Sequence, residues 1–240
     1  MKKIILASDY SDTAGSALDY AVALANKFGA RLSLVSAVNE PYSAAAGALV
    51  SITEKIREEA HETLSREADR VRGRLTGSAT VDTHTVDGAP GSTIPRVAAA
   101  KGYDLIVTGT HGSSDARELF TGSVANALIK HSEIPVLVVP VDTPPTAFAR
   151  VLVADDGAGG AGPQDQNLLN SLATAYGSRT ERFHDESGDP AAGIAEAVRE
   201  RGADLLVMTY HPRGVLSGLF TKSTVTKVAF DLAVPLLVLR

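Results

Sequence analysis

The sequence predicts two tandem α/β domains, each a doubly wound parallel sheet with helices on both faces, the second domain being shortened. Short apolar segments alternate with amphipathic ones along both halves, which is typical of this fold class. Apolar residues make up 44% of the chain and aromatic residues only 5%. Aliphatic side chains must therefore form most of the core, as in parallel sheets buried on both faces.

An internal repeat supports the division into two domains. The C-terminal part of each half recurs at a constant offset of 100 residues, so that the Leu-Phe-Thr run at 119–121 returns at 219–221. Other identities pair Gly88 with Gly188, Pro90 with Pro190, Ile94 with Ile194, Asp104 with Asp204, Pro135 with Pro235 and Leu137 with Leu237. The N-terminal part of the second copy is much shorter and lacks about one strand and one long helix.

The two prolines of Asp142–Thr146 cannot continue a strand ladder and predict a short, stiff linker. We therefore expect domains at 1–142 and 147–240. In the first domain we expect strands at 3–8, 31–38, 79–86, 105–108 and 136–139. We expect its helices from Ser11 or Asp12 to Gly29, from a capping box at Ser51–Glu54 to Leu75, from Ser92 onward, and over 123–131. In the second domain we expect four strands, beginning with 151–154 and 179–184, and a first helix over 165–176.

Composition excludes several classes of function. The net charge is −5 with no basic block, so nothing indicates a surface for nucleic acid. The chain has no cysteine, which excludes disulfides, thiol catalysis and cysteine-ligated zinc. The apolar run Ile4–Ala7 is too short for a signal peptide, and no run is long enough to cross a bilayer. We expect a soluble cytoplasmic protein without membrane association.

The most informative segment is Thr108–Gly112, followed after nine residues by Gly122–Val124. It connects an expected strand to an expected helix. Glycine lets a backbone approach phosphate closely, and the N–H groups of a helix N-terminus face the anion, so this context indicates a phosphate-binding loop. The alternative is that the glycines only form a tight turn before a helix. The loop is not of the Walker type, because no Gly-Lys-Ser/Thr follows.

The loop fits the pattern Gly-x2-Gly-x9-Gly-Ser at Gly109, Gly112, Gly122 and Ser123. This pattern resembles the ATP-binding motif of the universal stress protein family. The segments 4–11 and 36–39 also resemble that family's first strand and its adenine-side strand end. The resemblance covers nearly all of 1–140 and, more weakly, 150–240, as in a tandem-domain member. It implies an adenine nucleotide alpha hydrolase-like fold that binds ATP together with Mg²⁺.

The resemblance implies two groups of ATP-binding residues. Adenine and ribose would be surrounded by Ala7, Ser8, Asp9 and Ala37. The phosphates would be held by Thr108, Gly109, Thr110, His111, Gly112, Gly122, Ser123 and Val124. Two of these residues have a structural alternative. Asp9 can cap the following helix, and His111 recurs as His211 where the glycines do not, which favours a shared structural hydrogen bond. No catalytic residue and no protein ligand for a metal is assigned.

The second copy departs from the motif. Thr209, Pro212 and Lys222 stand where Gly109, Gly112 and Gly122 stand in the first copy. Pro212 lacks an N–H donor, and Lys222 puts a long side chain where the backbone must approach the phosphate. The lost strand and helix are also expected to remove the counterpart of Ala37. We expect no ATP site like the first one, and whether Lys222 leaves residual anion binding is open.

The sequence thus predicts an ATP-binding stress-response or regulatory protein rather than an enzyme. ATP is expected in the first domain. The second domain is expected to act as a built-in pseudo-dimer partner, its last strand pairing with the last strand of the first domain. A homodimer of two chains is a further expectation. Two alternatives stay open: a nucleotide-free dimeric scaffold and a slow ATPase.

Overall fold

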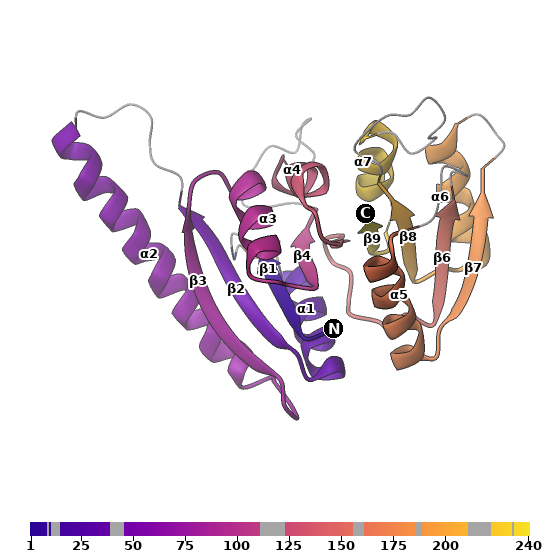
Figure 1. Cartoon of the computed structure of the whole chain (residues 1–240), viewed down its shortest axis with the longest axis horizontal. Coiled ribbons are helices and arrows are strands. Elements are labelled where there is room, and N and C mark those ends of the chain that lie inside the picture. Colours follow the sequence, from indigo (N-terminus) through magenta and orange to yellow (C-terminus); the bar gives the residue numbers. More distant parts are fainter. Residues whose placement is uncertain are drawn as a thin grey trace.

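The computed structural model describes residues 1–8, 10, 15–38, 46–110, 123–155, 161–185, 189–210, 222–231 and 233–240. Over these residues nine strands form one sheet with seven helices (Figure 1). The strands of the first copy are β1 (Lys3–Ala7), β2 (Arg31–Val38), β3 (Thr80–Asp87), β4 (Leu105–Gly109) and β5 (Val136–Val139). Those of the second copy are β6 (Arg150–Asp155), β7 (Arg179–His184), β8 (Leu205–Thr209) and β9 (Leu236–Leu239). The helices are α1 (Gly15–Phe28), α2 (Ala46–Arg72), α3 (Pro90–Ala100), α4 (Ser123–His131), α5 (Pro163–Tyr176), α6 (Pro190–Arg201) and α7 (Lys222–Asp231).

The strand order is β3-β2-β1-β4-β5-β9-β8-β6-β7. Every neighbouring pair is parallel except β5 and β9, which run antiparallel. The predicted α/β fold is confirmed, and the second copy has the four strands expected of it. The two copies share one continuous sheet, in which β7 occupies beside β6 the place that β2 occupies beside β1.

Helices cover both faces of the sheet. Buried side chains of α3, α4, α6 and α7 pack on one face, and those of α1, α2 and α5 pack on the other. Each of these two cores contains residues of both copies, because the sheet continues across their junction. No helix among the described residues is long and apolar enough to span a membrane.

The β5–β9 pairing has the symmetry of a dimer interface. Leu137 pairs with its repeat equivalent Leu237, and Val136 pairs with Val238 as Val138 pairs with Leu236, so a local two-fold axis passes through the Leu137–Leu237 pair. No residue of either strand exceeds 2% exposure. Helices α4 and α7 follow the same symmetry. The Thr226 hydroxyl of α7 lies 2.7 Å from the side-chain oxygen of Asn126, its repeat equivalent in α4. Pairing within the chain covers the edges that β5 and β9 would otherwise expose.

Arg240 ties the end of β9 to the first copy. Its guanidinium lies 2.6 Å from the carbonyl oxygen of Ile129 and 3.3 Å from that of Leu128, near the C-terminus of α4. It also stacks over the ring of Tyr210 at 5.1 Å, while the backbone N–H of Arg240 donates to Asp165 of α5. Burial lowers the pKa of Arg240 to about 10, so the guanidinium stays charged at neutral pH beside carbonyls that carry negative partial charge.

An aromatic residue directly after the linker packs between the two copies. Phe148 is 1% exposed and stacks on Tyr20 of α1, with ring centroids 5.9 Å apart. It also meets Tyr176 of α5 edge-on at 5.2 Å, and the ammonium of Lys27 lies 5.1 Å above the Tyr176 ring. Phe148 therefore joins α1 of the first copy to α5 of the second. The segment directly after the linker is therefore fixed against the first copy by aromatic packing.

Two helix starts were predicted wrongly. α2 begins at Ala46 rather than at the Ser51–Glu54 capping box, because the preceding Ala- and Leu-containing residues favour helix and extend it. It also ends at Arg72, before Leu75. α3 begins at Pro90 rather than at Ser92, because the fixed φ of proline suits the first helical position.

The helix end at Gly29 is confirmed, because Gly29 has a φ of +60° directly after α1. The predicted cap at Ser11 or Asp12 lies outside the described residues.

We expect Phe148→Ala to lower the free energy of unfolding by about 3–5 kcal/mol, because it empties a ring site between two helices. Urea denaturation followed by circular dichroism measures this change. The exposed neighbour Ala147 provides a control, since Ala147→Ser should change the unfolding free energy by less than about 0.5 kcal/mol. Equal stability of the two variants would show that the aromatic cluster does not hold the copies together.

Candidate functional site

The candidate site lies where the strand order of the first copy reverses. β1 pairs with β2 on one side and with β4 on the other, so the strand order runs outward from β1 in both directions. In parallel sheets such a switch point leaves a crevice beyond the carboxyl ends of the strands, and ligands bind there. Ala7, the last residue of β1, pairs with Val35 of β2 and with Thr108 of β4. The register thus brings two predicted site residues, Ala7 and Thr108, side by side.

Two of the predicted adenine-side residues, Ala7 and Ala37, share one face of the sheet. Ala7 and Val35 both belong to the core under α3 and α4. Ala37 lies two residues beyond Val35, so it points to the same face at the carboxyl end of β2. Ala7 is buried, whereas Ser8 and Ala37 are half-buried. Both half-buried residues lie at strand ends, where a ligand could reach them.

The turn after β1 is shaped by Ser8. Its hydroxyl accepts a hydrogen bond from the backbone N–H of Tyr10 at 2.9 Å, and Tyr10 has a φ of +57°. A positive φ at a bulky residue is rare, and the Ser8 hydrogen bond helps to hold it. Asp9, which carries the predicted nucleoside contact, lies outside the described residues.

The predicted phosphate-side residues come from β4 and α4. Thr108 and Thr110 are buried, Gly109 between them is half-buried, and the Thr110 N–H donates to the carbonyl of Val139 at 3.0 Å. This bond continues the β4–β5 ladder up to Thr110, the last described residue before the glycine loop. Ser123 begins α4 and is exposed. His111, Gly112 and Gly122 lie outside the described residues.

The start of α4 is suited to an anion. Its first backbone N–H groups have no partner within the helix, and the helix dipole adds positive partial charge there. Val124, the second residue of α4, is half-buried and packs against the core on the Ala7 face. The described part of the site therefore combines a strand-end crevice with a helix N-terminus on the same face.

The site prediction left out the β3–α3 connection. Val86 pairs with Ala37, and the N–H of Gly88 donates to the carbonyl of Val38 at 2.9 Å. Gly88 has a φ of +111°, which only glycine adopts readily, and a side chain there would crowd Thr93. This turn borders the side of the crevice where the sequence predicts adenine. The identity of Gly88 with Gly188 in the repeat was the signal that could have included it.

In the second copy, β8 ends at Thr209 and α7 begins at Lys222, the positions of Gly109 and Gly122 in the first. Pro212 lies outside the described residues. The prediction that a counterpart of Ala37 is missing was wrong. Since β7 takes the place of β2, the strand absent from the second copy corresponds to β3, and Asp185 stands at the register position of Ala37. Asp185 is 6% exposed, so a buried carboxylate replaces a methyl group.

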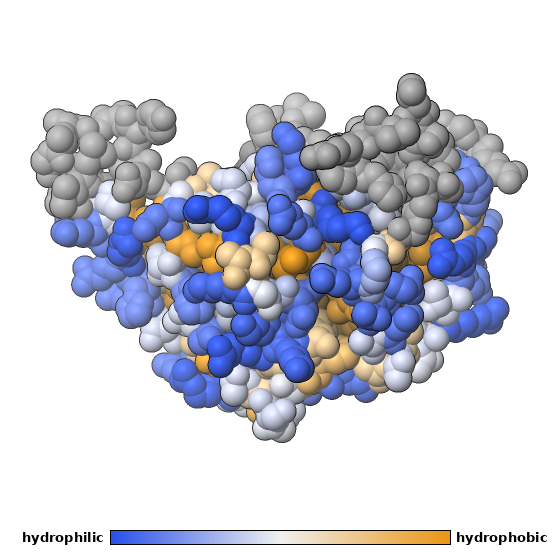
Figure 2. Space-filling view, in the orientation of Figure 1, coloured by the Kyte–Doolittle hydropathy of each residue, from blue (hydrophilic) through white to orange (hydrophobic). Residues whose placement is uncertain are grey.

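Hydrophilic residues lie over both halves of the face drawn in Figure 2, with apolar residues between them. No group of three or more His, Asp or Glu side chains that could hold a metal occurs within the described ranges. Asp115 and Glu118, the acidic residues of the glycine loop, lie outside those ranges.

The position of α4 depends on its contact with α3. Gly91 of α3 is buried, and a Cβ built on it would overlap the Cβ of Ala127 in α4. Only glycine allows the two helices to approach so closely. The start of α4 is thereby held over the face that carries Ala7 and Thr108.

We expect Gly91→Val to lower the free energy of unfolding by about 1–3 kcal/mol and to displace α4, because the added side chain overpacks this contact. Thermal unfolding and the nuclear magnetic resonance shifts of Ser123 and Val124 report the two effects. Gly15→Ala is the matched control, since no described residue has an atom within 4 Å of the added Cβ. Unchanged stability in the Gly91 variant would contradict the close approach.

Three comparisons relate this geometry to known proteins. The model of the universal stress protein family matches residues 1–140 and again residues 142–240. A universal stress protein of Methanocaldococcus jannaschii is 32% identical over 141 residues, which are 58% of this chain and 81% of the relative. A putative universal stress protein of Staphylococcus haemolyticus is 33% identical and covers 61% of this chain and 89% of its own length.

Solved structures that resemble the whole chain include the following one. It is a universal stress protein from Archaeoglobus fulgidus, with a TM-score of 0.74 and 19% sequence identity. The likeness covers 99% of this chain and 96% of that protein. At this identity it shows a shared fold, including the arrangement of the two copies.

Proposed function

We propose, from the premise that this chain belongs to the universal stress protein family, that its first copy binds ATP. The observation that carries the proposal is the convergence of Ala7, Thr108 and the start of α4 on one face at the switch point of the sheet. The half-buried Ser8 and Ala37 would meet ribose and adenine. The glycine loop and the N-terminus of α4 would receive the phosphates through backbone N–H groups.

We propose that the nucleotide enters with Mg²⁺. A triphosphate carries several negative charges, and one helix N-terminus contributes only about half a positive charge. A divalent cation held by the phosphate oxygens would supply most of the remaining neutralisation. The proposal gives this cation no protein ligand among the described residues.

The second copy is proposed to act as a permanent pseudo-dimer partner. Its support is the β5–β9 pairing, in which Leu137 meets Leu237, together with the hydrogen bond between Thr226 and Asn126. These contacts stabilise β5 and α4, the elements that follow and flank the nucleotide loop. The second copy would thus support the site without binding ATP itself.

The proposed role is regulatory, in the cytoplasm, and assigns no catalytic residue. A homodimer of two chains is a separate proposal. It requires a surface other than β5 and β9, because these strands already cover each other. Sedimentation equilibrium decides this point, and release of inorganic phosphate over hours detects slow hydrolysis.

We expect the wild-type chain to bind ATP in the presence of Mg²⁺, as measured by isothermal titration calorimetry. Gly122→Lys, which copies position 222, should weaken binding at least about tenfold, because it replaces a close backbone approach with a long side chain. Lys222→Gly is the matched control in the second copy and should leave the affinity unchanged.

Three results would overturn parts of the proposal. Absence of ATP binding by the wild type would leave the nucleotide-free scaffold as the function. Equal binding by Gly122→Lys would place the site elsewhere. Weakened binding in Lys222→Gly would show that the second copy takes part in binding.

A further inference from the structure

A cavity of about 210 Å³ opens in the second copy, at the amino ends of β6 and β7 and beside the end of α6. Three arginines from these three elements line it: Arg150, Arg179 and Arg201. Val151 and Leu152 contribute buried apolar surface to its wall. The candidate ATP site lies at the carboxyl ends of the first copy's strands, so this cavity belongs to a different place in the fold.

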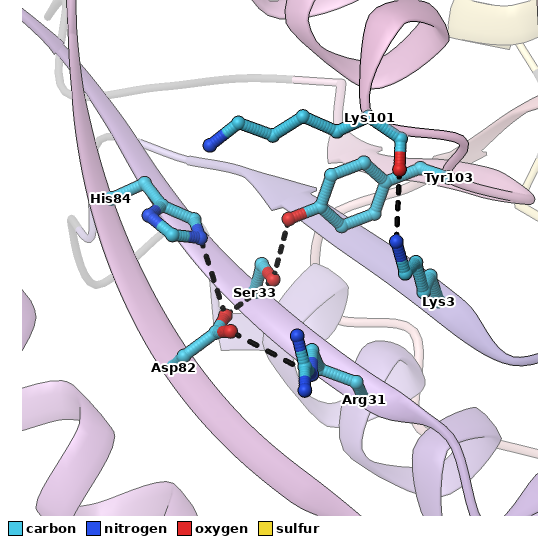
Figure 3. A network of polar contacts seen from close by, with 7 residues as sticks. All are labelled: Lys3, Arg31, Ser33, Asp82, His84, Lys101 and Tyr103. Atoms are coloured by element: carbon cyan, nitrogen blue, oxygen red, sulfur yellow. Dashed lines mark hydrogen bonds and ion pairs between the residues drawn. The ribbon is translucent and has the colours of Figure 1, made fainter.

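The first copy fills the equivalent position with a tyrosine. The strand registers make Lys3, Arg31 and Ser33 equivalent to Arg150, Arg179 and Glu181, since Lys3 pairs with Arg31 as Arg150 pairs with Arg179. The repeat offset likewise makes Tyr103 equivalent to Ala203. Figure 3 shows the Tyr103 ring lying across this position, with its hydroxyl donating to Ser33 at 2.7 Å.

The tyrosine completes a closed polar network in the first copy. Ser33 donates in turn to Asp82 of β3, and Asp82 lies 3.8 Å from Arg31 (Figure 3). The second copy has no strand equivalent to β3, so it has no counterpart of Asp82 at this place. Replacement of Tyr103 by Ala203 removes the ring as well, which leaves the cavity and its arginines open.

Positive charge exceeds negative charge around the cavity. Glu181 is the one carboxylate in the lining. It lies 2.9 Å from the guanidinium of Arg179 and 3.7 Å from that of Arg201. Arg150 forms no ion pair with any described carboxylate, and its guanidinium packs against Gly202, where a Cβ would come within 2.9 Å of it. The lining therefore holds three guanidinium groups and one carboxylate, which pairs with two of them.

One further carboxylate, that of Asp204, lies near the cavity but outside its lining, so the arginines still outnumber the carboxylates. Asp204, next to Ala203, already accepts the backbone N–H groups of Ala149 and Arg150 at 3.0 to 3.1 Å. Arg201 donates to the carbonyl of Arg182 at 3.3 Å and lies over the Phe183 ring at 5.0 Å, which orients it beside the cavity. Arg150 is thus the cation best placed to bind an added anion.

We propose that this cavity binds a small anion carrying a phosphate group. Guanidinium groups present paired N–H donors that match the oxygens of phosphate, and three of them on separate elements can surround a tetrahedral anion. The volume is below the range typical of drug-sized ligands, so inorganic phosphate or a short phosphate monoester fits and a nucleotide does not. The apolar wall would contact the short carbon chain of a monoester.

Calorimetric titration of the full-length chain at low ionic strength tests the proposal, first with inorganic phosphate and then with glycerol 3-phosphate. We expect one site per chain, and Arg150→Gln should weaken it at least about tenfold. Ala203→Tyr, which copies the first copy, should abolish binding by filling the cavity. Arg199→Gln is the matched control, because Arg199 is exposed on α6 outside the cavity.

The proposed nucleotide loop of the first copy can also bind phosphate. The Gly122→Lys variant distinguishes the two sites, because it alters the loop and should keep phosphate binding in the cavity. Tighter binding of glycerol 3-phosphate would identify a monoester as the ligand, and equal or tighter binding of inorganic phosphate would identify the free ion. Absence of binding by the wild type overturns the proposal, as does unchanged binding in Arg150→Gln. If Ala203→Tyr fails to fold, the Arg150 and Arg199 variants still decide the question.

Discussion

The antiparallel pairing of β5 with β9 is the constraint on which the rest of the structure depends. It is the one antiparallel step in a sheet whose other described neighbours are parallel. Because Leu137 meets Leu237, the step relates the two copies by a local two-fold axis, and each copy covers the other's exposed edge. The two cores extend across the same line, so each core contains residues of both copies.

Much of the fold could be predicted from the sequence because its buried strands are short apolar runs bounded by turn residues. The start of α2 could not be predicted. The capping box at Ser51–Glu54 indicates a later start than the helix-favouring residues before it allow. The burial of Phe148 and the capping of α4 by Arg240 also escaped prediction. Both depend on how the two copies meet, and neither residue has a counterpart of the same type in the repeat.

For the candidate site, Ala7 and Thr108 came from the resemblance to the universal stress protein family, and the strand register places them side by side at the carboxyl ends of β1 and β4. The position of Asp185 in the sheet could not be predicted from the sequence. The shortened N-terminal part of the second copy does not reveal which strand is absent. Only the pairing of β7 with β6 shows that the outer strand is missing and that a carboxylate stands where Ala37 stands.

Fusion of the two copies explains how such differences can persist. In a symmetric dimer of identical chains every substitution occurs twice, so a Lys at the position of Gly122 would alter both nucleotide loops at once. In this chain Lys222 and Ala203 each occur once, in the second copy. That copy still pairs with β5 through β9. The contact between Thr226 and Asn126 is itself a pair of unlike residues at equivalent positions, which a symmetric dimer could not form. Selection can therefore maintain the junction in both copies while each copy's strand ends evolve separately.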